Sequence, residues 1–224
     1  MTKNKTTVPE EVTQTYANGA LKETKFIREG RIEGEYTSYF QNGQIMAQIH
    51  YSAGRKNGEA ITYYADGQLR EKSHFLNDRL HGEYLSYFEN GHLREEEHYK
   101  NGKLDGQYRR YFKTGELREE EHFKDGKFNG DYVCYYKTGQ IKEKGAFVSD
   151  KREGDYIAYY RSGKIRENAV YKNDKPVGKF QSFLESGGVS DDEGLEDTDS
   201  KRVWEEKDIA GLLSDLSHFE KKNK

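Results

Sequence analysis

Short aromatic runs and glycine turns alternate along this chain at a fixed spacing. In one unit, residues 84–88 form an aromatic run, Asn90-Gly91 follows as a turn, and residues 93–99 form a second run with polar residues interleaved. Short runs of this kind that are bounded by turn residues are typical of β-strands. Residues 101–106 then form a longer, glycine-bounded turn into the next unit. Each unit is therefore predicted to be a β-hairpin.

The glycines give the period of the repeat, which is 24 residues. Two columns contain only glycine and a third contains glycine or aspartate: Gly19, Gly43, Gly67, Gly91, Gly115, Gly139, Gly163 and Gly187; Gly34, Gly58, Gly82, Gly106, Gly130, Gly154 and Gly178; Gly30, Gly54, Asp78, Gly102, Gly126, Asp150 and Asp174. Glycine adopts positive φ without cost and aspartate tolerates it, which suits turn positions. The Asn90-Gly91 pair favours a type I′ turn within the unit.

The aromatic positions keep the same register. Two of their columns are Tyr36, Ala60, Tyr84, Tyr108, Tyr132, Tyr156 and Phe180, and Tyr39, Tyr63, Tyr87, Tyr111, Tyr135, Tyr159 and Phe183. An isolated hairpin is marginal in water, but stacked hairpins cover one another's side chains. The predicted fold class is all-β: a solenoid of stacked 24-residue β-hairpin repeats that form an elongated antiparallel sheet, followed by a C-terminal amphipathic helix.

The pattern divides the chain into four segments. We predict a polar N-terminal tail at residues 1–15, the hairpin repeat domain at 16–184, an acidic flexible linker at 185–199 and the amphipathic helix at 200–221. The linker contains seven acidic residues and no lysine or arginine. From residue 185 onward the chain has 12 acidic and 6 basic residues, so that part carries −6 and residues 1–184 carry +3.

The predicted helix has apolar residues at helical spacing, with a tryptophan at the margin of the stripe. These residues are the candidate partner-binding residues of the helix: Trp204, Ile209, Leu212, Leu213, Leu216 and Phe219. Two interpretations are open. The helix caps the exposed edge of the last hairpin, or it docks into a groove on a partner. The tether between repeats and helix favours docking slightly.

Composition alone would suggest disorder, since 34% of residues are charged and the mean hydropathy is −1.14. The 18 tyrosines and 11 phenylalanines contradict that class. A net charge of −3 gives no general attraction to nucleic acid. No apolar stretch is long enough to cross a bilayer, and the polar N-terminus lacks the apolar core of a signal peptide, so we expect a cytoplasmic protein.

No group of residues indicates catalysis, so we expect a protein that is not an enzyme and has no cofactor, metal or catalytic residue. His50, His74, His98 and His122 share one column, but equivalent positions on successive hairpins are about 9.6 Å apart, too far to share one zinc ion. Cys134 lies in a column that tolerates almost any residue, and no base that could activate it is evident.

A basic column provides the candidate partner-binding residues of the repeat face: Arg70, Arg94, Arg118, Lys142 and Arg166. The next residue in each unit is acidic, as in Arg94-Glu95. Because consecutive strand residues point to opposite faces, we expect a basic stripe on one face and an acidic stripe on the other. The basic stripe is either a strip that binds a charged partner or a solubilising surface, and the second interpretation is favoured.

The repeated units resemble the MORN-repeat variant family, which includes YwqK-type antitoxins. The residues that carry the resemblance are Tyr99, Gly102, Lys103, Gly106, Tyr108, Tyr111, Phe112, Gly115 and Leu117. The resemblance covers roughly residues 16–189 and implies a hairpin-repeat fold that serves as a scaffold, a membrane-associated module or an antitoxin-like partner.

Two functions are open from the sequence. The first is a non-enzymatic protein-interaction module, in its narrower form an antitoxin or immunity protein that sterically blocks a toxin. The alternative is a membrane-associated scaffold that binds acidic headgroups through the basic column. The partner, the face that binds it and the oligomeric state are not specified by the sequence.

Overall fold

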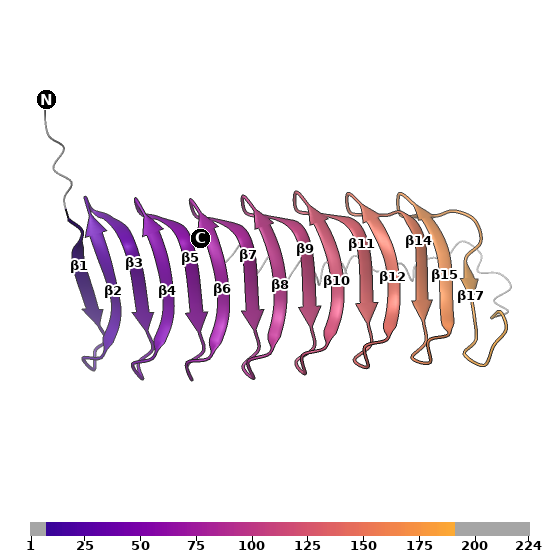
Figure 1. Cartoon of the computed structure of the whole chain (residues 1–224), viewed down its shortest axis with the longest axis horizontal. Coiled ribbons are helices and arrows are strands. Elements are labelled where there is room, and N and C mark those ends of the chain that lie inside the picture. The colour runs from indigo at the N-terminus through magenta and orange to yellow at the C-terminus, as the bar shows by residue number, and fades with distance from the viewer. Residues whose placement is uncertain (1–7, 191–224) are drawn as a thin grey trace, which may run out of the picture.

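The computed structural model describes residues 8–190, which form one open antiparallel sheet of 17 strands. Figure 1 shows the hairpins side by side in chain order, so that the sheet is elongated. From β1 to β12 each strand pairs with its neighbours in sequence, whereas β13 and β14 both pair with β12, and β16 and β17 both pair with β15. The all-β fold of stacked hairpins is therefore confirmed. The predicted C-terminal helix lies outside the described residues.

Eleven consecutive strands, β2 to β12, alternate between eight and nine residues, and apart from the eight-residue β15 the strands nearer the two ends of the sheet are shorter. The strands are β1 Glu10–Thr15, β2 Leu21–Arg28, β3 Arg31–Tyr39, β4 Ile45–Ser52, β5 Arg55–Tyr63, β6 Leu69–Leu76, β7 Arg79–Tyr87, β8 Leu93–Lys100, β9 Lys103–Tyr111, β10 Leu117–Lys124, β11 Lys127–Tyr135, β12 Ile141–Val148, β13 Lys151–Arg152, β14 Gly154–Tyr159, β15 Ile165–Lys172, β16 Lys175–Pro176 and β17 Gln181–Ser182.

The sheet extends beyond both predicted boundaries of the repeat domain. Residues assigned to the polar N-terminal tail form β1, which pairs with β2. At the other end, Phe183 forms an isolated bridge with Val189, so the first residues of the predicted acidic linker close the last hairpin. Unpaired backbone groups at the edge of a sheet gain from one more strand, even one of polar sequence, which is why composition misplaced these limits.

The turn within each unit differs from the predicted type I′ turn. Gly91 N–H donates to Phe88 C=O at 2.9 Å, and Phe88 N–H donates to His92 C=O at 2.9 Å. Gly91 has φ 82°, whereas a type I′ turn would also require positive φ at Asn90. The loop is a type I turn followed by a left-handed glycine, which is the common three-residue hairpin connection.

Type I′ geometry occurs instead at the turn between units. Asn101 and Gly102 have φ 53° and 82°, and the flanking Lys100 and Lys103 pair directly. This turn has two central residues, so the predicted longer turn is wrong. The strand resumes at Lys103 and continues through Gly106, which the sequence pattern had assigned to the turn.

These inter-unit turns are hydrogen-bonded to one another along the edge of the sheet. Gly102 N–H donates to Leu80 C=O of the preceding unit at 2.8 Å. Where aspartate replaces glycine, Asp78 N–H donates to Lys56 C=O, and Asp78 Oδ1 accepts a hydrogen bond from Lys56 N–H at 2.8 Å. The aspartate therefore adds a contact that glycine cannot make. This explains why both residues occupy the column.

The two faces of the sheet differ in character. One face carries the first aromatic column together with a glutamate column, and we call it the aromatic–carboxylate face. The other face carries the histidines and the second tyrosine column, and we call it the histidine face. The buried cluster of Leu104, Tyr108 and Phe123, with Tyr99 and Phe128 packed against it, lies on the aromatic–carboxylate face.

The rings on the aromatic–carboxylate face pack against one another in pairs across neighbouring strands, and several of these pairs are edge to face. The centroids of Tyr108 and Phe123 are 5.8 Å apart with an interplanar angle of 70°, and Phe123 lies 4.3 Å from Phe128. Such pairs contribute roughly 0.5–1.5 kcal/mol beyond the area that they bury. Where Ala60 interrupts the column, the Lys56 ammonium lies 5.0 Å from the centre of the Phe75 ring.

The invariant glycine column is explained by positive φ at every one of its positions, and in three units also by close packing of strands on the histidine face. A Cβ atom at Gly130 would lie 2.8 Å from the Cβ atom of His122, and one at Gly106 would lie 3.0 Å from that of His98. Gly130 also has φ 134°, a backbone conformation that is nearly restricted to glycine. The glycine and the histidine of the preceding strand therefore form one packing unit.

This packing predicts different costs for two glycine substitutions. Gly130→Ala should destabilise the fold by roughly 2 kcal/mol or more, because it combines backbone strain with the clash. Gly139→Ala should cost about 1–2 kcal/mol, because Gly139 has φ 84° and open space around its Cβ position. Urea unfolding of the two variants measures the difference, and equal costs would contradict the proposed glycine–histidine packing.

Candidate functional site

A β-bulge in every unit places the basic column beside the glutamate column. Ser86 pairs with Glu95 and Tyr87 pairs with Leu93, so Arg94 has no opposite residue. Alternation between faces is lost at this position, and Arg94 Nη2 lies 2.9 Å from Glu95 Oε2. The expectation of basic and acidic stripes on opposite faces is therefore wrong.

The same pairing recurs in other units. Arg70 Nε lies 3.4 Å from Glu71 Oε1, and Arg166 Nε lies 3.1 Å from Glu167 Oε1. Arg118 is exposed and Lys142 is half-buried. The five basic residues predicted for partner binding thus lie at the bulges, and three of them already pair with a glutamate. The six candidate residues of the predicted helix lie outside the described residues.

The glutamates of this column also accept hydrogen bonds from hydroxyl groups on neighbouring strands. Tyr132 Oη and Tyr156 Oη donate to the two carboxylate oxygens of Glu143, each at 3.0 Å. Ser86 Oγ donates to Glu95 at 3.1 Å. Each buried carboxylate therefore connects adjacent strands, and it orients the tyrosine rings that line the face.

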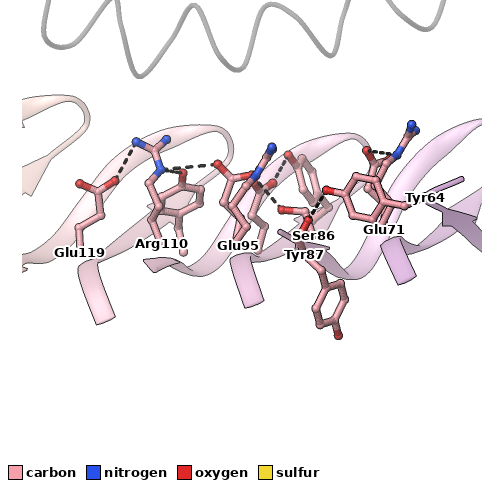
Figure 2. Close-up of polar contacts among 12 residues, drawn as sticks. Tyr64, Glu71, Ser86, Tyr87, Glu95, Arg110 and Glu119 are labelled. Atoms are coloured by element: carbon pink, nitrogen blue, oxygen red, sulfur yellow. Dashed lines mark hydrogen bonds and ion pairs between the residues drawn. The ribbon is translucent and has the colours of Figure 1, made fainter. Parts of the chain in front are cut away.

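Arg110 lies at the centre of the aromatic–carboxylate face, between the glutamates of two units. Its guanidinium is 3.0 Å from Glu119 Oε1 and 3.5 Å from Glu95 Oε1. Figure 2 shows Glu119, Arg110 and Glu95 in a row on one side of the sheet. Arg110 Nε also donates a hydrogen bond to Tyr108 Oη at 3.0 Å. Only 13% of the Arg110 side chain is exposed. A planar guanidinium suits such a bridging position.

Two further carboxylates, Glu97 and Glu121, lie on this face, and both are almost completely buried, at 3% and 1% exposure. Tyr99 Oη donates a hydrogen bond to Glu97. Within the described part of the chain, neither oxygen of Glu121 has a hydrogen-bond partner. Burial raises the pKa of Glu97 to about 7, and burial together with the charge of Glu119 raises the pKa of Glu121 to about 8. The centre of the face therefore holds carboxyl groups that titrate near neutral pH.

Glu97, Glu121 and Arg110 were not predicted as site residues from the sequence, because the acidic runs are typical of a solvated surface. The sequence does contain a pattern that could have identified the two glutamates as facing the aromatic side of the sheet. Glu97 and Glu121 stand two residues before the aromatic residues Tyr99 and Phe123, and strand alternation puts residues two apart on the same face. The sequence cannot show that neighbouring rings exclude water from these carboxylates.

The histidine face and Cys134 show no feature of a reactive site. His98 lies opposite Glu83, and His122 Nδ1 is 3.3 Å from Asp131 O. Among residues 8–190, no group of three histidine, cysteine or acidic residues is arranged to hold a metal ion. Burial raises the pKa of the Cys134 thiol, which disfavours the reactive thiolate. No helix within the described residues is long and apolar enough to span a bilayer.

The two neighbouring arginines of β9 offer a matched test of the buried ion pairs. Arg110→Ala should destabilise the protein by about 3 kcal/mol, because it removes the buried cation that Glu95 and Glu119 share and leaves Glu95 with Arg94 alone. Arg109 makes the equivalent bridge on the histidine face, to Glu120 at 3.0 Å and Glu96 at 3.3 Å, but its side chain is 31% exposed. Arg109→Ala should therefore cost at most about 1 kcal/mol. Chemical denaturation of both variants measures the two costs, and a larger loss for Arg109→Ala would contradict this account.

The raised pKa of Glu121 predicts a specific pH dependence of stability. Folded Glu121 holds its proton to about pH 8, whereas the ordinary pKa is 4.5. The folded state therefore binds more protons than the unfolded state between these values, and stability is lost as the pH rises through that window. The slope for one fully coupled proton approaches about 1.4 kcal/mol per pH unit.

Urea titrations at several pH values between 5 and 9 measure this slope. Glu121→Gln cannot titrate and should show a flatter profile than the wild-type protein. Identical profiles for the two proteins would show that Glu121 ionises normally in the folded state.

The repeats match a known family in register with the hairpins. The model of a MORN repeat variant matches six tandem segments: residues 32–53, 56–77, 80–101, 104–125, 128–148 and 152–173. Each segment begins at the second residue of a strand, five of the six end in the next inter-unit turn, and the segment 128–148 ends at the last residue of β12. No curated protein matches the chain.

Solved structures give only weak likenesses. The chain is similar to part of a GtfA/B complex bound to UDP and GlcNAc, with 15% identity, a TM-score of 0.22, and coverage of 49% of this chain and 22% of the other. It is also similar to part of TcdB2-TccC3-TEV, with 13% identity, a TM-score of 0.23, and coverage of 81% and 13%. A protein of unknown function from Bacteroides fragilis has 9% identity, a TM-score of 0.12, and coverage of 75% and 96%.

The chain thus spans less than a quarter of the length of the first two structures, and at these TM-scores the likenesses carry no argument about function. The family match is of a different kind, because six consecutive segments in one register together cover more than half of the chain. By that match, the chain belongs to the MORN repeat variant family.

Proposed function

We propose that this protein is a non-enzymatic interaction module that binds a protein partner on its aromatic–carboxylate face. Repeats of this family are binding modules for proteins or membranes. The observation that carries the proposal is the composition of this face: aromatic rings recur along one side of a single sheet, and its centre holds Arg110 and buried carboxylates. Aromatic and arginine side chains are also the residues that dominate binding energy in protein interfaces.

The chemistry of the face favours a partner with apolar and basic side chains. Glu97 and Glu121 lie among the rings, and Arg110 is shared by Glu95 and Glu119. A lysine or arginine from a partner would stabilise the ionised form of the two buried glutamates, which burial alone disfavours. The rings around them would supply the apolar contact area.

An antitoxin or immunity protein is the narrower form of this proposal. In that role the extended sheet would cover the active site of a toxin and act by steric occlusion. The support for it is the resemblance of the repeats to those of antitoxins in the family.

The alternative, binding of acidic lipid headgroups through the basic column, has less support. Arg70, Arg94 and Arg166 each pair with the glutamate that follows them. Headgroup binding depends on positive charge that is free to meet phosphate. Because of these ion pairs, the basic column carries less free positive charge than its sequence suggests.

Two tyrosines of β14 provide a matched test of the proposed binding face. Tyr156 lies on the aromatic–carboxylate face, its ring centroid 6.1 Å from that of Tyr171, and Tyr159 lies on the histidine face. Both are half-buried. In affinity capture from the native host followed by titration of the recovered partner, Tyr156→Ala should weaken binding at least about tenfold, as loss of an aromatic hot spot does. Tyr159→Ala should retain binding.

A parallel sedimentation assay with anionic liposomes, repeated at increasing salt, tests the membrane alternative. We expect no salt-sensitive binding, because headgroup attraction would weaken with screening. An equal loss of affinity for the partner in Tyr156→Ala and Tyr159→Ala would contradict binding at the aromatic–carboxylate face. Recovery of liposomes without a protein partner would overturn the proposal.

A further inference from the structure

We propose that the edge of the sheet formed by the inter-unit turns is a second interaction surface, which binds an acidic, extended segment of a protein partner. The first residue after each of these turns is lysine or arginine in every unit: Arg31, Arg55, Arg79, Lys103, Lys127, Lys151 and Lys175. We call this set the basic edge. It is separate from the aromatic–carboxylate face, so the inference goes beyond the proposed function.

The two long edges of the sheet differ in charge. Figure 1 shows the inter-unit turns along one edge and the turns within units along the other. The seven four-residue inter-unit turns, of which residues 100–103 are one example, contain 11 basic and 5 acidic side chains, a net charge of +6. The seven five-residue turns within units from residue 16 to residue 164 contain 4 basic and 3 acidic side chains, a net charge of +1. One edge of a chain with an overall charge of −3 is therefore strongly positive.

The side chains of the basic edge are all exposed and have no counter-ion within the sheet. None of them takes part in an ion pair with another residue of the range 8–190. The aspartates of the same turns are engaged by the backbone instead. Asp150 Oδ1 accepts a hydrogen bond from Phe128 N–H, and Asp174 Oδ1 accepts one from Arg152 N–H, each at 2.8 Å. The positive charges are therefore available to an anionic ligand.

Four inter-unit turns place like charges directly opposite one another. The opposed pairs are Arg28–Arg31, Lys100–Lys103, Lys124–Lys127 and Lys172–Lys175. Like charges at opposite positions destabilise a pair of strands, and an acidic residue at either position would relieve the repulsion. A surface that served solubility alone would mix the two signs. The repeated repulsion therefore points to an anion that binds there and relieves it.

Hydrogen bonds between successive turns fix the spacing of the basic edge. Gly126 N–H donates to Leu104 C=O of the preceding unit at 2.7 Å. The stem of Lys103 lies against the same turn, since a Cβ atom at Gly126 would be 3.7 Å from Lys103 Cβ. The charges thus recur about every 9.6 Å. This interval is close to the Debye length of about 10 Å at 0.1 M salt, so neighbouring charges act together on a ligand.

The spacing suits a polypeptide with an acidic side chain at every third residue. A polyproline II segment has three residues per turn and rises about 3.1 Å per residue, so such side chains lie on one side about 9.3 Å apart. Nucleic acid has denser charge, about one phosphate per 3.4 Å of each strand, and proteins that bind single strands add aromatic stacking platforms. The inter-unit turns contain no aromatic residue. Leu76 and Val148, exposed at two of these turns, offer apolar contact to the residues between the acids.

Fluorescence anisotropy with a labelled, end-capped (Glu-Pro-Pro)6 peptide tests the proposal on the full-length protein. Binding should be measurable at about 50 mM salt and weaken steadily towards about 300 mM. Lys103→Glu/Lys127→Glu should weaken it about tenfold, because two contacts are lost and repulsion is added. The same variant should unfold at no lower urea concentration than the wild-type protein, since Lys100 and Lys124 then face opposite charges. A purely structural role of the two lysines would instead lower the urea midpoint.

The matched control is Lys113→Glu/Lys137→Glu, on the opposite edge. Both lysines are exposed and lie in turns within units, and the variant has the same net charge as Lys103→Glu/Lys127→Glu. It should bind the peptide as the wild-type protein does. A second control is the peptide (Pro)6-(Glu)6-(Pro)6, which has the same composition. Its acids span only about 19 Å, or two intervals of the basic edge, so it should bind several-fold more weakly.

Five outcomes overturn the inference. The peptide does not bind at low salt, the two double variants lose affinity equally, or the block peptide binds as tightly as the spaced one. Displacement of the peptide by an equal concentration of a thymidine heptanucleotide, which also carries six charges, would assign the edge to nucleic acid. Binding to phosphatidylserine vesicles that Lys103→Glu/Lys127→Glu abolishes would assign it to a membrane. Tyr156→Ala should leave peptide binding unchanged, so failure here is distinct from failure of the proposed function.

Discussion

Contact between side chains of adjacent hairpins is the interaction on which this sheet depends. With a single layer of strands over residues 8–190, a side chain finds cover only from the strands on either side. The 24-residue period is what makes this possible, because it returns each residue type to the same place one hairpin later. The edge-to-face rings, the tyrosine–glutamate hydrogen bonds and the stacked turns are all products of that register.

The register also explains how charge enters the buried face. A glutamate that accepts hydroxyl groups from two strands, as Glu143 does, is stabilised without a cation. In the middle units this arrangement changes, because Arg110 stands in a column of otherwise small residues and Glu97 and Glu121 stand in a column of mostly small or apolar residues. The centre of the face therefore differs electrostatically from its ends although the backbone repeats. Local charge on a uniform scaffold is a simple way to give a repeat protein a distinct binding region.

Much of the fold could be predicted from the sequence, because glycine spacing and aromatic alternation reflect the backbone directly. The assignment of turn types was reversed, since Asn90-Gly91 suits more than one hairpin loop and only the hydrogen bonds of Phe88 distinguish them. The bulge at Arg94 was also missed, and with it the pairing of Arg94 with Glu95. An extra residue in a strand leaves no mark in a strictly periodic sequence, because every unit contains it. Burial of Glu121 depends on residues of the adjacent strands, such as Tyr108 and Tyr132, and could not be inferred locally.

The two ends of the described sheet limit how it meets other strands. β1 presents an edge with the sequence EEVTQT, in which five of six residues are exposed, and two glutamates stand at its start. Charged residues on an edge oppose pairing with another strand. At the other end β17 has two residues, and the bridge between Phe183 and Val189 folds the chain over it. Pairing of a second chain with either edge of the described sheet is thus disfavoured. The number of strands in the sheet is therefore set by the number of repeats in one chain. Duplication of an internal unit would lengthen the ribbon without creating a new edge, which gives this architecture a direct route to binding faces of different span.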